Sequence, residues 1–337
     1  MPGGNRGYNL VMNNQILVWV GFNLLVLALL ALDLGVINRH AHEIKIGEAL
    51  VWSVAWTVVA LIFGAGLWYA RGQEAGMQYF TAYVVERALS MDNLFVFLLI
   101  FAYFCVEGIY QHRVLFWGIL GALVMRALFI GAGITLINRF HWVIYVFGAF
   151  LIYTGIKMAF SKGQEIHPDR NPAYRLFRRF MDPSAGMAGG HFFIRKDGKL
   201  KLTPLFIVLL VVETSDVVFA VDSIPAVLAI SRDPFIAYSS NVMAILGLRA
   251  LYFALAGMMR MFHHLHYGLS IILAFVGAKM LGEGFLEKLG YEIPIWLALG
   301  LIVVLLLLSV MSSLIWPEKK KDPTADDRKC IDQAASK

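Results

Sequence analysis

Two stretches of this sequence place carboxylates inside runs of apolar residues. The first, VVERALSMDNLFVF, contains Glu86 and Asp92, and the second, ETSDVVFAVDSIPA, contains Asp216 and Asp222. In both stretches the two acids are six residues apart. A carboxylate at membrane depth is costly, and the acids that persist there are usually functional. The two stretches therefore indicate a membrane protein with a polar site in its interior.

The composition also favours a membrane protein over a soluble domain. Apolar residues make up 59% of the 337 residues, charged residues make up only 15%, and the mean hydropathy is +0.68. Because about 20 apolar residues cross a bilayer as a helix, the runs predict an all-α polytopic membrane protein with nine transmembrane helices. Their expected ranges are 15–37, 47–69, 78–104, 114–136, 141–160, 204–230, 235–259, 266–287 and 293–315.

Basic residues predict how these helices are oriented. Residues 161–201 contain nine Lys and Arg, and the tail after Trp316 contains six. Cytoplasmic loops are rich in these residues, so both segments should be cytoplasmic, with the N-terminus outside and the protein in the inner (cytoplasmic) membrane. Orientation accounts for these charges without a nucleic-acid partner. On the cytoplasmic side we expect no disulfide between Cys105 and Cys330.

The second half of the chain repeats the order of motifs in the first half. VMRALFI at 124–130 and TGIKM at 154–158 follow the first acidic stretch, and GLRALYF at 247–253 and VGAKM at 276–280 follow the second. Two copies of three helices joined by a cytoplasmic linker must enter the membrane from opposite sides, as in the inverted repeats of many secondary transporters. The expected parts are two flanking helices (1–75), a first three-helix repeat (76–160), a basic cytoplasmic linker (161–202), a second three-helix repeat (203–289) and a last helix with a basic tail (290–337).

The polar residues of the spans predict a site for a divalent cation near the middle of the membrane. The candidate oxygen ligands are Glu86, Asp92, Asn93, Glu213, Asp216, Asp222 and Ser223, with Asp33, near the end of its span, as an accessory. Carboxylate, amide and hydroxyl oxygens suit hard or borderline cations such as Mg²⁺, Ca²⁺ and Mn²⁺. The alternative is that the acids form buried ion pairs that only join helices.

Basic residues inside the spans are expected to balance these acids. An isolated charge in the bilayer costs roughly 3 kcal/mol, so most of the acids must be paired, protonated or in contact with water. The candidate counter-charges are Arg126, Lys157, Arg249 and Lys279, which occupy matching places in the two repeats, together with Arg87 beside Glu86.

Proline and glycine predict two local departures from straight helix. Pro225 lies three residues after Asp222 and cannot donate a backbone hydrogen bond to the carbonyl of Val221. We therefore expect that helix to be interrupted beside the acid. Asp197-Gly198 predicts a small β-hairpin at the end of the linker, the alternative being a flexible segment.

Other polar side chains have less specific interpretations. Asn241 and Ser239 are expected to be helix-end residues. His263, His264 and His266 form a cluster at a predicted cytoplasmic turn. Histidines there suit either a pH sensor or an ordinary interfacial loop.

The motifs resemble those of a known family. ERALSMDN, followed by ETSDVVFAVDSIPA, RALYF and GAKM, is similar to the TerC family of integral membrane proteins, with the closest likeness to its Alx branch, which also shares the HFF-basic-Gly segment before the second repeat. The resemblance covers residues 15–315. It implies manganese export, an alkaline-pH-linked role for the Alx branch and a place in the wider LysE-type transporter group. It assigns the metal site to Glu86, Asp92, Asp216 and Asp222, with Asn93, Glu213 and Ser223 as helpers.

The residues themselves indicate a divalent cation, and the resemblance specifies Mn²⁺. We therefore expect a secondary transporter that exports Mn²⁺ and is coupled to protons or to the membrane potential, with no cofactor besides the transported ion. One alternative is a membrane interaction protein of a stress or secretion complex that docks through linker 161–201. The other is an intramembrane enzyme, for which the sequence offers no sharp nucleophile.

Overall fold

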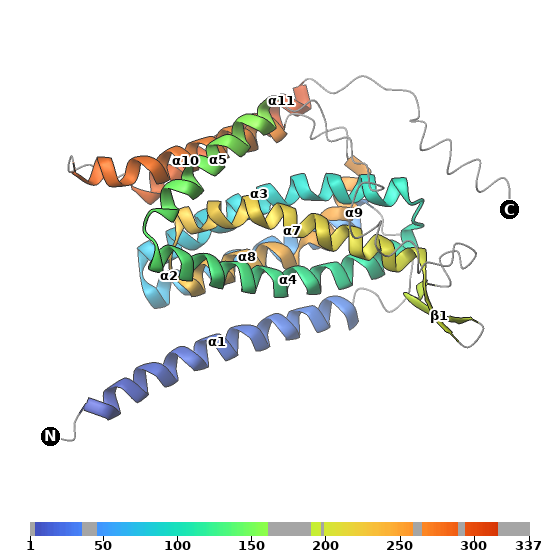
Figure 1. Cartoon of the computed structure of the whole chain (residues 1–337), viewed down its shortest axis with the longest axis horizontal. Coiled ribbons are helices and arrows are strands. Elements are labelled where there is room, and N and C mark those ends of the chain that lie inside the picture. The colour runs from blue at the N-terminus through green and yellow to red at the C-terminus, as the bar shows by residue number, and fades with distance from the viewer. Residues whose placement is uncertain are drawn as a thin grey trace. The chain divides into compact units, whose positions relative to one another are not determined.

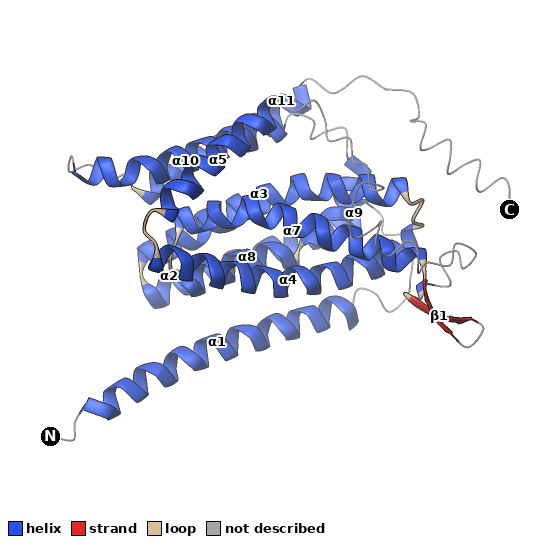
Figure 2. Cartoon of the chain, viewed as in Figure 1, coloured by secondary structure: helices blue, strands red, loops and turns tan. Residues whose placement is uncertain are grey.

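The computed structural model describes residues 4–35, 46–160, 190–196, 199–258, 265–288 and 294–315. The chain forms two compact units, Met1–His42 and Glu43–Lys337. In the first unit the described residues form one helix of 32 residues, α1 (Gly4–Gly35). The second unit contains all the other described elements (Figures 1 and 2).

Helices dominate the second unit, as the sequence predicts. They are α2 (Ile46–Arg71), α3 (Gln73–Tyr103), α4 (Gly108–Arg139), α5 (Val143–Phe160), α7 (Pro204–Ile230), α8 (Pro234–Leu246), α9 (Leu248–Met258), α10 (Leu265–Lys288) and α11 (Ile295–Ile315). Two helix starts have clear local causes. Thr203 and Asp233 accept hydrogen bonds from backbone N–H groups of the first turns of α7 and α8, and a proline follows each of them. A polar N-cap followed by proline is a strong start signal.

The described helices include seven that are long and apolar enough to cross a membrane, or up to eight if the bent pair α8 and α9 forms one span. This confirms an all-α polytopic membrane protein. The predicted span 78–104 is helical as α3, but α3 is not among these seven helices because Glu86, Arg87 and Asp92 interrupt its apolar sequence. Nine crossings therefore stay a prediction.

The predicted interruption at Pro225 is wrong. Proline lies inside a continuous α7 that runs from Pro204 to Ile230. Helix α7 packs against α3, α4, α5 and α10, and neighbouring helices allow a transmembrane helix to tolerate the hydrogen bond that proline removes. The break lies in the following span, where α8 and α9 meet at Gly247 with a bend of 42°.

The predicted hairpin is confirmed. Strands β1 (Phe193–Lys196) and β2 (Lys199–Leu202) pair antiparallel, with Phe193 opposite Leu202. Its base is attached to two helices: Arg113 of α4 donates to the carbonyl of Gly190 at 2.5 Å, and the Phe193 and Phe206 rings lie 4.9 Å apart. Linker residues 161–189 lie outside the described residues, as do His263 and His264. Cys105 is disulfide-bonded, so the expectation of an unpaired cysteine is wrong.

Two kinds of helix contact organise the second unit. Helices α5 and α10 lie side by side (Figure 1) and run antiparallel, because Gly148 contacts Leu281 while Gly155, later in α5, contacts Ser270, earlier in α10. Helices α7 and α8 each pack against both α3 and α4. The acidic stretches lie on α3 and α7, so this second group positions the candidate site.

Candidate functional site

Arg126 of α4 is the centre of a buried polar cluster. Its side chain is 1% exposed. Its Nη1 donates to Glu86 Oε1 at 2.7 Å and to Ser223 Oγ at 2.5 Å, and lies 3.4 Å from Asn241 Oδ1. Its Nη2 lies 3.9 Å from Asp216 Oδ1. One guanidinium therefore joins α3, α4, α7 and α8.

Both oxygens of the Glu86 carboxylate have hydrogen-bond partners. Oε1 accepts from Arg126 and, at 3.3 Å, from Ser90 Oγ, while Oε2 accepts from Asn241 Nδ2 at 3.0 Å. Glu86 is completely buried. A buried ion pair is tolerable only when further hydrogen bonds satisfy its remaining groups, and Ser90 and Asn241 provide them. Both Glu86 oxygens therefore accept hydrogen bonds, and Glu86 holds Arg126 in place.

Asp216 differs from Glu86 because only one of its oxygens approaches Arg126. The separation of 3.9 Å exceeds a hydrogen bond, and Oδ2 is buried without a hydrogen-bond partner. Buried polar atoms are nearly always satisfied, so each exception needs an explanation such as an ion, a water or a catalytic role. Asp216 is therefore the acid in this cluster with unused capacity to bind a cation.

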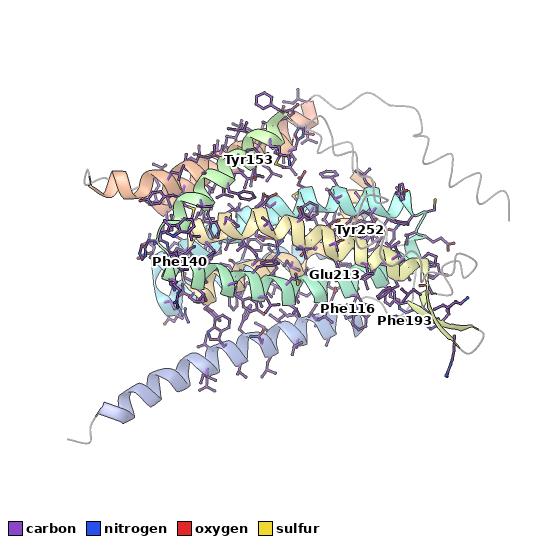
Figure 3. All side chains as sticks on the ribbon, viewed as in Figure 1. Phe116, Phe140, Tyr153, Phe193, Glu213 and Tyr252 are labelled. Atoms are coloured by element: carbon purple, nitrogen blue, oxygen red, sulfur yellow. The ribbon has the colours of Figure 1, made fainter. Side chains whose placement is uncertain are left out.

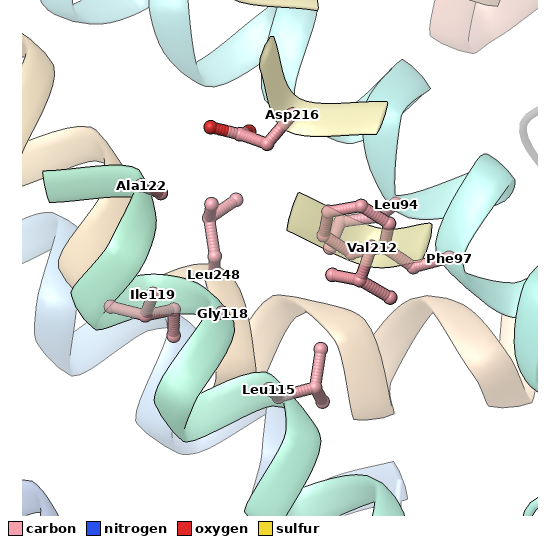
Figure 4. Close-up of a pocket in the computed structure, with 9 residues that line it drawn as sticks. All are labelled: Leu94, Phe97, Leu115, Gly118, Ile119, Ala122, Val212, Asp216 and Leu248. Atoms are coloured by element: carbon pink, nitrogen blue, oxygen red, sulfur yellow. The ribbon is translucent and has the colours of Figure 1, made fainter. Parts of the chain in front are cut away.

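A pocket lies beside Asp216 (Figure 4). Its lining residues come from α3, α4, α7 and α9 and are Leu94, Phe97, Leu115, Gly118, Ile119, Ala122, Val212, Asp216 and Leu248. Figure 4 shows the Asp216 carboxylate facing the apolar side chains of the other helices. The pocket thus combines an apolar wall with a single anionic group.

The other predicted ligands lie near this cluster in sequence but make different contacts. Glu213, which is labelled in Figure 3, lies on α7 one turn before Asp216 and is partly buried. Its carboxylate lies against Gly121 of α4. Asp222 accepts from Thr154 Oγ1 of α5 at 3.2 Å. The side chains of Asp92 and Asn93 make no hydrogen bond or ion pair with any other residue that the structure describes. The seven predicted ligands therefore do not share one set of contacts.

Of the predicted counter-charges, Arg126 makes the contacts described above. Arg249 is buried in α9. Lys157 is exposed and Lys279 is half-buried, and neither lysine lies within 4.0 Å of a carboxylate oxygen in the described part of the chain. Asp33 is buried and belongs to α1, in the other compact unit.

Arg87 does not pair with the adjacent Glu86. Its Nη1 donates to the carbonyl of Ala244 at 2.9 Å, and its Nη2 donates to Ser53 Oγ at 3.2 Å. The carbonyl belongs to the last turn of α8, where helix carbonyls lack partners and carry partial negative charge. Arg87 thus stabilises the break between α8 and α9 rather than the acidic cluster.

The structure adds residues that the sequence interpretation missed or misjudged. Asn241 is fully buried in the middle of α8, so the expectation of a helix-end residue is wrong. Thr154 also contacts a predicted acid. The available signal was an amide within the apolar helix SSNVMAIL, because a buried amide requires partners. No group of three or more His, Cys, Asp and Glu side chains in the described ranges is arranged to hold a metal, so metal binding stays a prediction.

Comparison with known proteins gives the family. The sequence profile of the Integral membrane protein TerC family matches residues 71–321. This chain belongs to the TerC family. The TerC-family chain is 47% identical to an uncharacterized membrane protein, STKORF319, of Myxococcus xanthus, over 92% of this chain and 95% of the relative. It is 43% identical to Alx of Escherichia coli K12, over 87% of this chain and 92% of that protein, whose name describes it as a candidate membrane-bound redox modulator.

The family membership agrees with the fold. The protein is a multi-pass integral membrane protein of the TerC family with Alx-type relatives. No solved structure matches the chain.

Proposed function

We propose that this TerC-family protein is a secondary transporter that exports a divalent cation, with Mn²⁺ as the substrate implied by the family resemblance. The carrying observation is Asp216, which is buried beside Arg126 with one unpartnered oxygen. A carboxylate retained in this state inside a membrane protein is a functional-site candidate. Charge and geometry together favour a cation as the ligand of this carboxylate.

The charge balance of the cluster suits a divalent ion. With both carboxylates ionised, Glu86, Asp216 and Arg126 carry one net negative charge, and an ionised Glu213 adds a second. Arg126 lies 2.7 Å from Glu86 but 3.9 Å from Asp216. A cation approaching Asp216 thus competes with the weaker of the two contacts, because Coulomb attraction falls with distance.

Each residue has a distinct role in this proposal. Asp216 and Glu213 bind the cation, and Arg126 neutralises Asp216 when the ion has left. Glu86, with Ser90 and Asn241, keeps Arg126 from following the ion. Transport is coupled to protons or to the membrane potential, and the protein lies in the inner membrane with the N-terminus outside.

Two alternatives remain distinguishable from transport. The name of the Escherichia coli relative concerns redox modulation, and a protein with that role alone would move no metal. An interaction protein would depend on the hairpin and linker and would tolerate neutral substitutes for buried acids.

The decisive experiment measures Mn²⁺ flux into proteoliposomes and the manganese content of expressing cells. Asp216→Asn keeps the shape and removes the charge, so we expect flux to fall ~10-fold or more. Asp92→Asn and Asp222→Asn should also reduce it. Glu107→Gln is the matched control, because Glu107 is exposed at the start of α4. Wild-type flux from Asp216→Asn, or no flux from the native protein, would refute the proposal.

A further inference from the structure

We infer that the apolar pocket beside Asp216 is the closed cytoplasmic entrance for the cation. In this inference Glu213 is the first carboxylate that the ion meets. Gly121 is a positioning residue for Glu213. This inference rests on the proposed function and specifies the side of the membrane from which the cation enters. It depends on the lining of the pocket, the unpartnered Asp216 oxygen and the contact between Glu213 and α4.

The pocket lies on one side of the polar cluster along every helix that lines it. On α3, Leu94 and Phe97 come after Glu86, whereas on α4, Leu115 comes before Arg126. On α7, Val212 similarly comes before Asp216. The chain directions of α3 and α4 are opposite if they are successive spans, so these positions point to the same end of the bundle.

That end is the cytoplasmic one if the basic residues set the orientation. The basic segment 161–201 precedes α7, and Arg113 near the start of α4 donates to the carbonyl of Gly190 in this segment. Basic loops favour the cytoplasm. The pocket therefore lies between the polar cluster and the predicted cytoplasmic surface.

The pocket lining is suited to a closed gate. Every lining residue except Asp216 is apolar. A narrow apolar segment next to a charged site blocks ions by excluding water until it widens. Leu94, Ile119 and Leu248 come from three different helices, so a small relative movement of those helices would open the passage.

Glu213 lies one turn nearer than Asp216 to the start of α7, beside the pocket rather than in its lining. Glu213 is partly exposed, whereas Asp216 is 7% exposed one turn further along α7. The Glu213 carboxylate occupies the space where a Cβ at position 121 would lie. Only glycine allows the carboxylate to rest on the α4 backbone, so Gly121 determines where Glu213 lies.

The first test compares two substitutions on the same helix. Gly121→Ala should raise the KM for Mn²⁺ about tenfold with little change in kcat, because it displaces Glu213. Gly131→Ala should leave both values unchanged, since nothing lies within 4 Å of a Cβ there. Adding Glu213→Asp to Gly121→Ala should restore part of the affinity, because the shorter acid leaves room for the methyl group. An unchanged KM in Gly121→Ala would overturn the role of Gly121.

The second test addresses the side of entry with a single cysteine. In a protein with Cys105→Ser and Cys330→Ser, Leu115→Cys should react with an impermeant thiol reagent in inside-out vesicles, and Mn²⁺ should slow the reaction. Val124→Cys is the control, because Val124 is exposed on the outer face of α4 and does not line the pocket. Mn²⁺ should not change its reactivity. Labelling from the outer side only, or none while Mn²⁺ transport persists, would overturn the entrance and leave the proposed function intact. Cytoplasmic labelling without Mn²⁺ transport would support an entrance and refute the proposed substrate.

Discussion

The polar cluster around Arg126 and the helix pair α5 and α10 hold helices of one unit together by different kinds of contact. The cluster gathers charged and polar side chains from α3, α4, α7 and α8 and satisfies most of them by hydrogen bonds. The pair α5 and α10 depends instead on residues without side chains, which let two backbones approach closely. Small residues serve this purpose in membranes because packing there has no hydrophobic driving force.

The contacts of the helix pair have a regularity that the polar cluster lacks. A Cβ at Gly155 would lie 2.6 Å from the carbonyl oxygen of Ser270, and a Cβ at Gly277 would lie 2.6 Å from that of Gly148. The TGIKM and VGAKM motifs match Gly155 with Gly277, and Gly148 and Ser270 each lie seven residues earlier. If the two repeats correspond as predicted, these two contacts are equivalent. The contacts fit the predicted correspondence, which itself stays a prediction.

The acids show where the two halves differ. Asp222 accepts a hydrogen bond from Thr154. Asp92 occupies the matching place in the first repeat, but the residue that matches Thr154 in the second repeat is Val276, which has no hydroxyl. Packing is equivalent in the two halves while the polar contacts are not.

The largest expected effect comes from removing the centre of the cluster. Arg126→Met leaves Glu86 buried without its cation, and breaking a buried ion pair in this way costs about 3–5 kcal/mol of folding free energy. Unfolding of the purified protein by heat or denaturant measures the loss. Arg139→Met, at the exposed end of the same helix, is the control.

A second substitution sharpens this first prediction. Adding Glu86→Met to Arg126→Met removes the orphaned charge and should recover part of the lost stability, as replacement of a whole buried ion pair by apolar residues often does. If the double variant is no more stable than the single one, Glu86 is not the group left unsatisfied. Hydrogen bonds from Arg126 to Ser223 would then be the larger contribution.

An intermediate effect is expected from the helix pair. Gly155→Ala and Gly277→Ala each force a methyl group against a backbone carbonyl, and overpacking of this kind costs typically about 1–3 kcal/mol. Gly300→Ala, where nothing lies within 4 Å, is the matched control. The KM for Mn²⁺ should stay unchanged. If one of the two glycines tolerates alanine and the other does not, the equivalence of the two contacts is wrong.

The sequence predicted the helices better than the contacts between them. Hydropathy places α5, α7 and α10 within a few residues, because the length of an apolar run follows directly from bilayer thickness. The hairpin at Asp197-Gly198 was also predictable from local turn chemistry. Pro225 misled the interpretation because tolerance of proline depends on neighbouring helices, which no local pattern reveals.

In the candidate site, too, the sequence predicted which residues are involved better than it predicted their contacts. Glu86, Arg126, Asp216 and Ser223 were all named from the sequence, because charge and polarity inside apolar runs are visible there. Which of them touch was not visible. Asn241 contacts Glu86 from 155 positions away, and the adjacent Arg87 turns instead toward Ala244. Neighbours on a helix point in different directions, so nearness in sequence does not identify ion-pair partners.

The smallest expected effect concerns Lys157, which the sequence placed among the counter-charges. Lys157→Met should change the free energy of unfolding by no more than about 0.5 kcal/mol, because Lys157 is exposed and exposed substitutions rarely do more. Arg126→Met should lower the free energy of unfolding several times as much. Comparing the two variants therefore distinguishes the effect of removing a buried charge from that of removing an exposed one. Unfolding under identical conditions measures both. A loss above about 1 kcal/mol in Lys157→Met would exceed the usual contribution of an exposed ion pair, and it would restore Lys157 to the counter-charges that the sequence predicts.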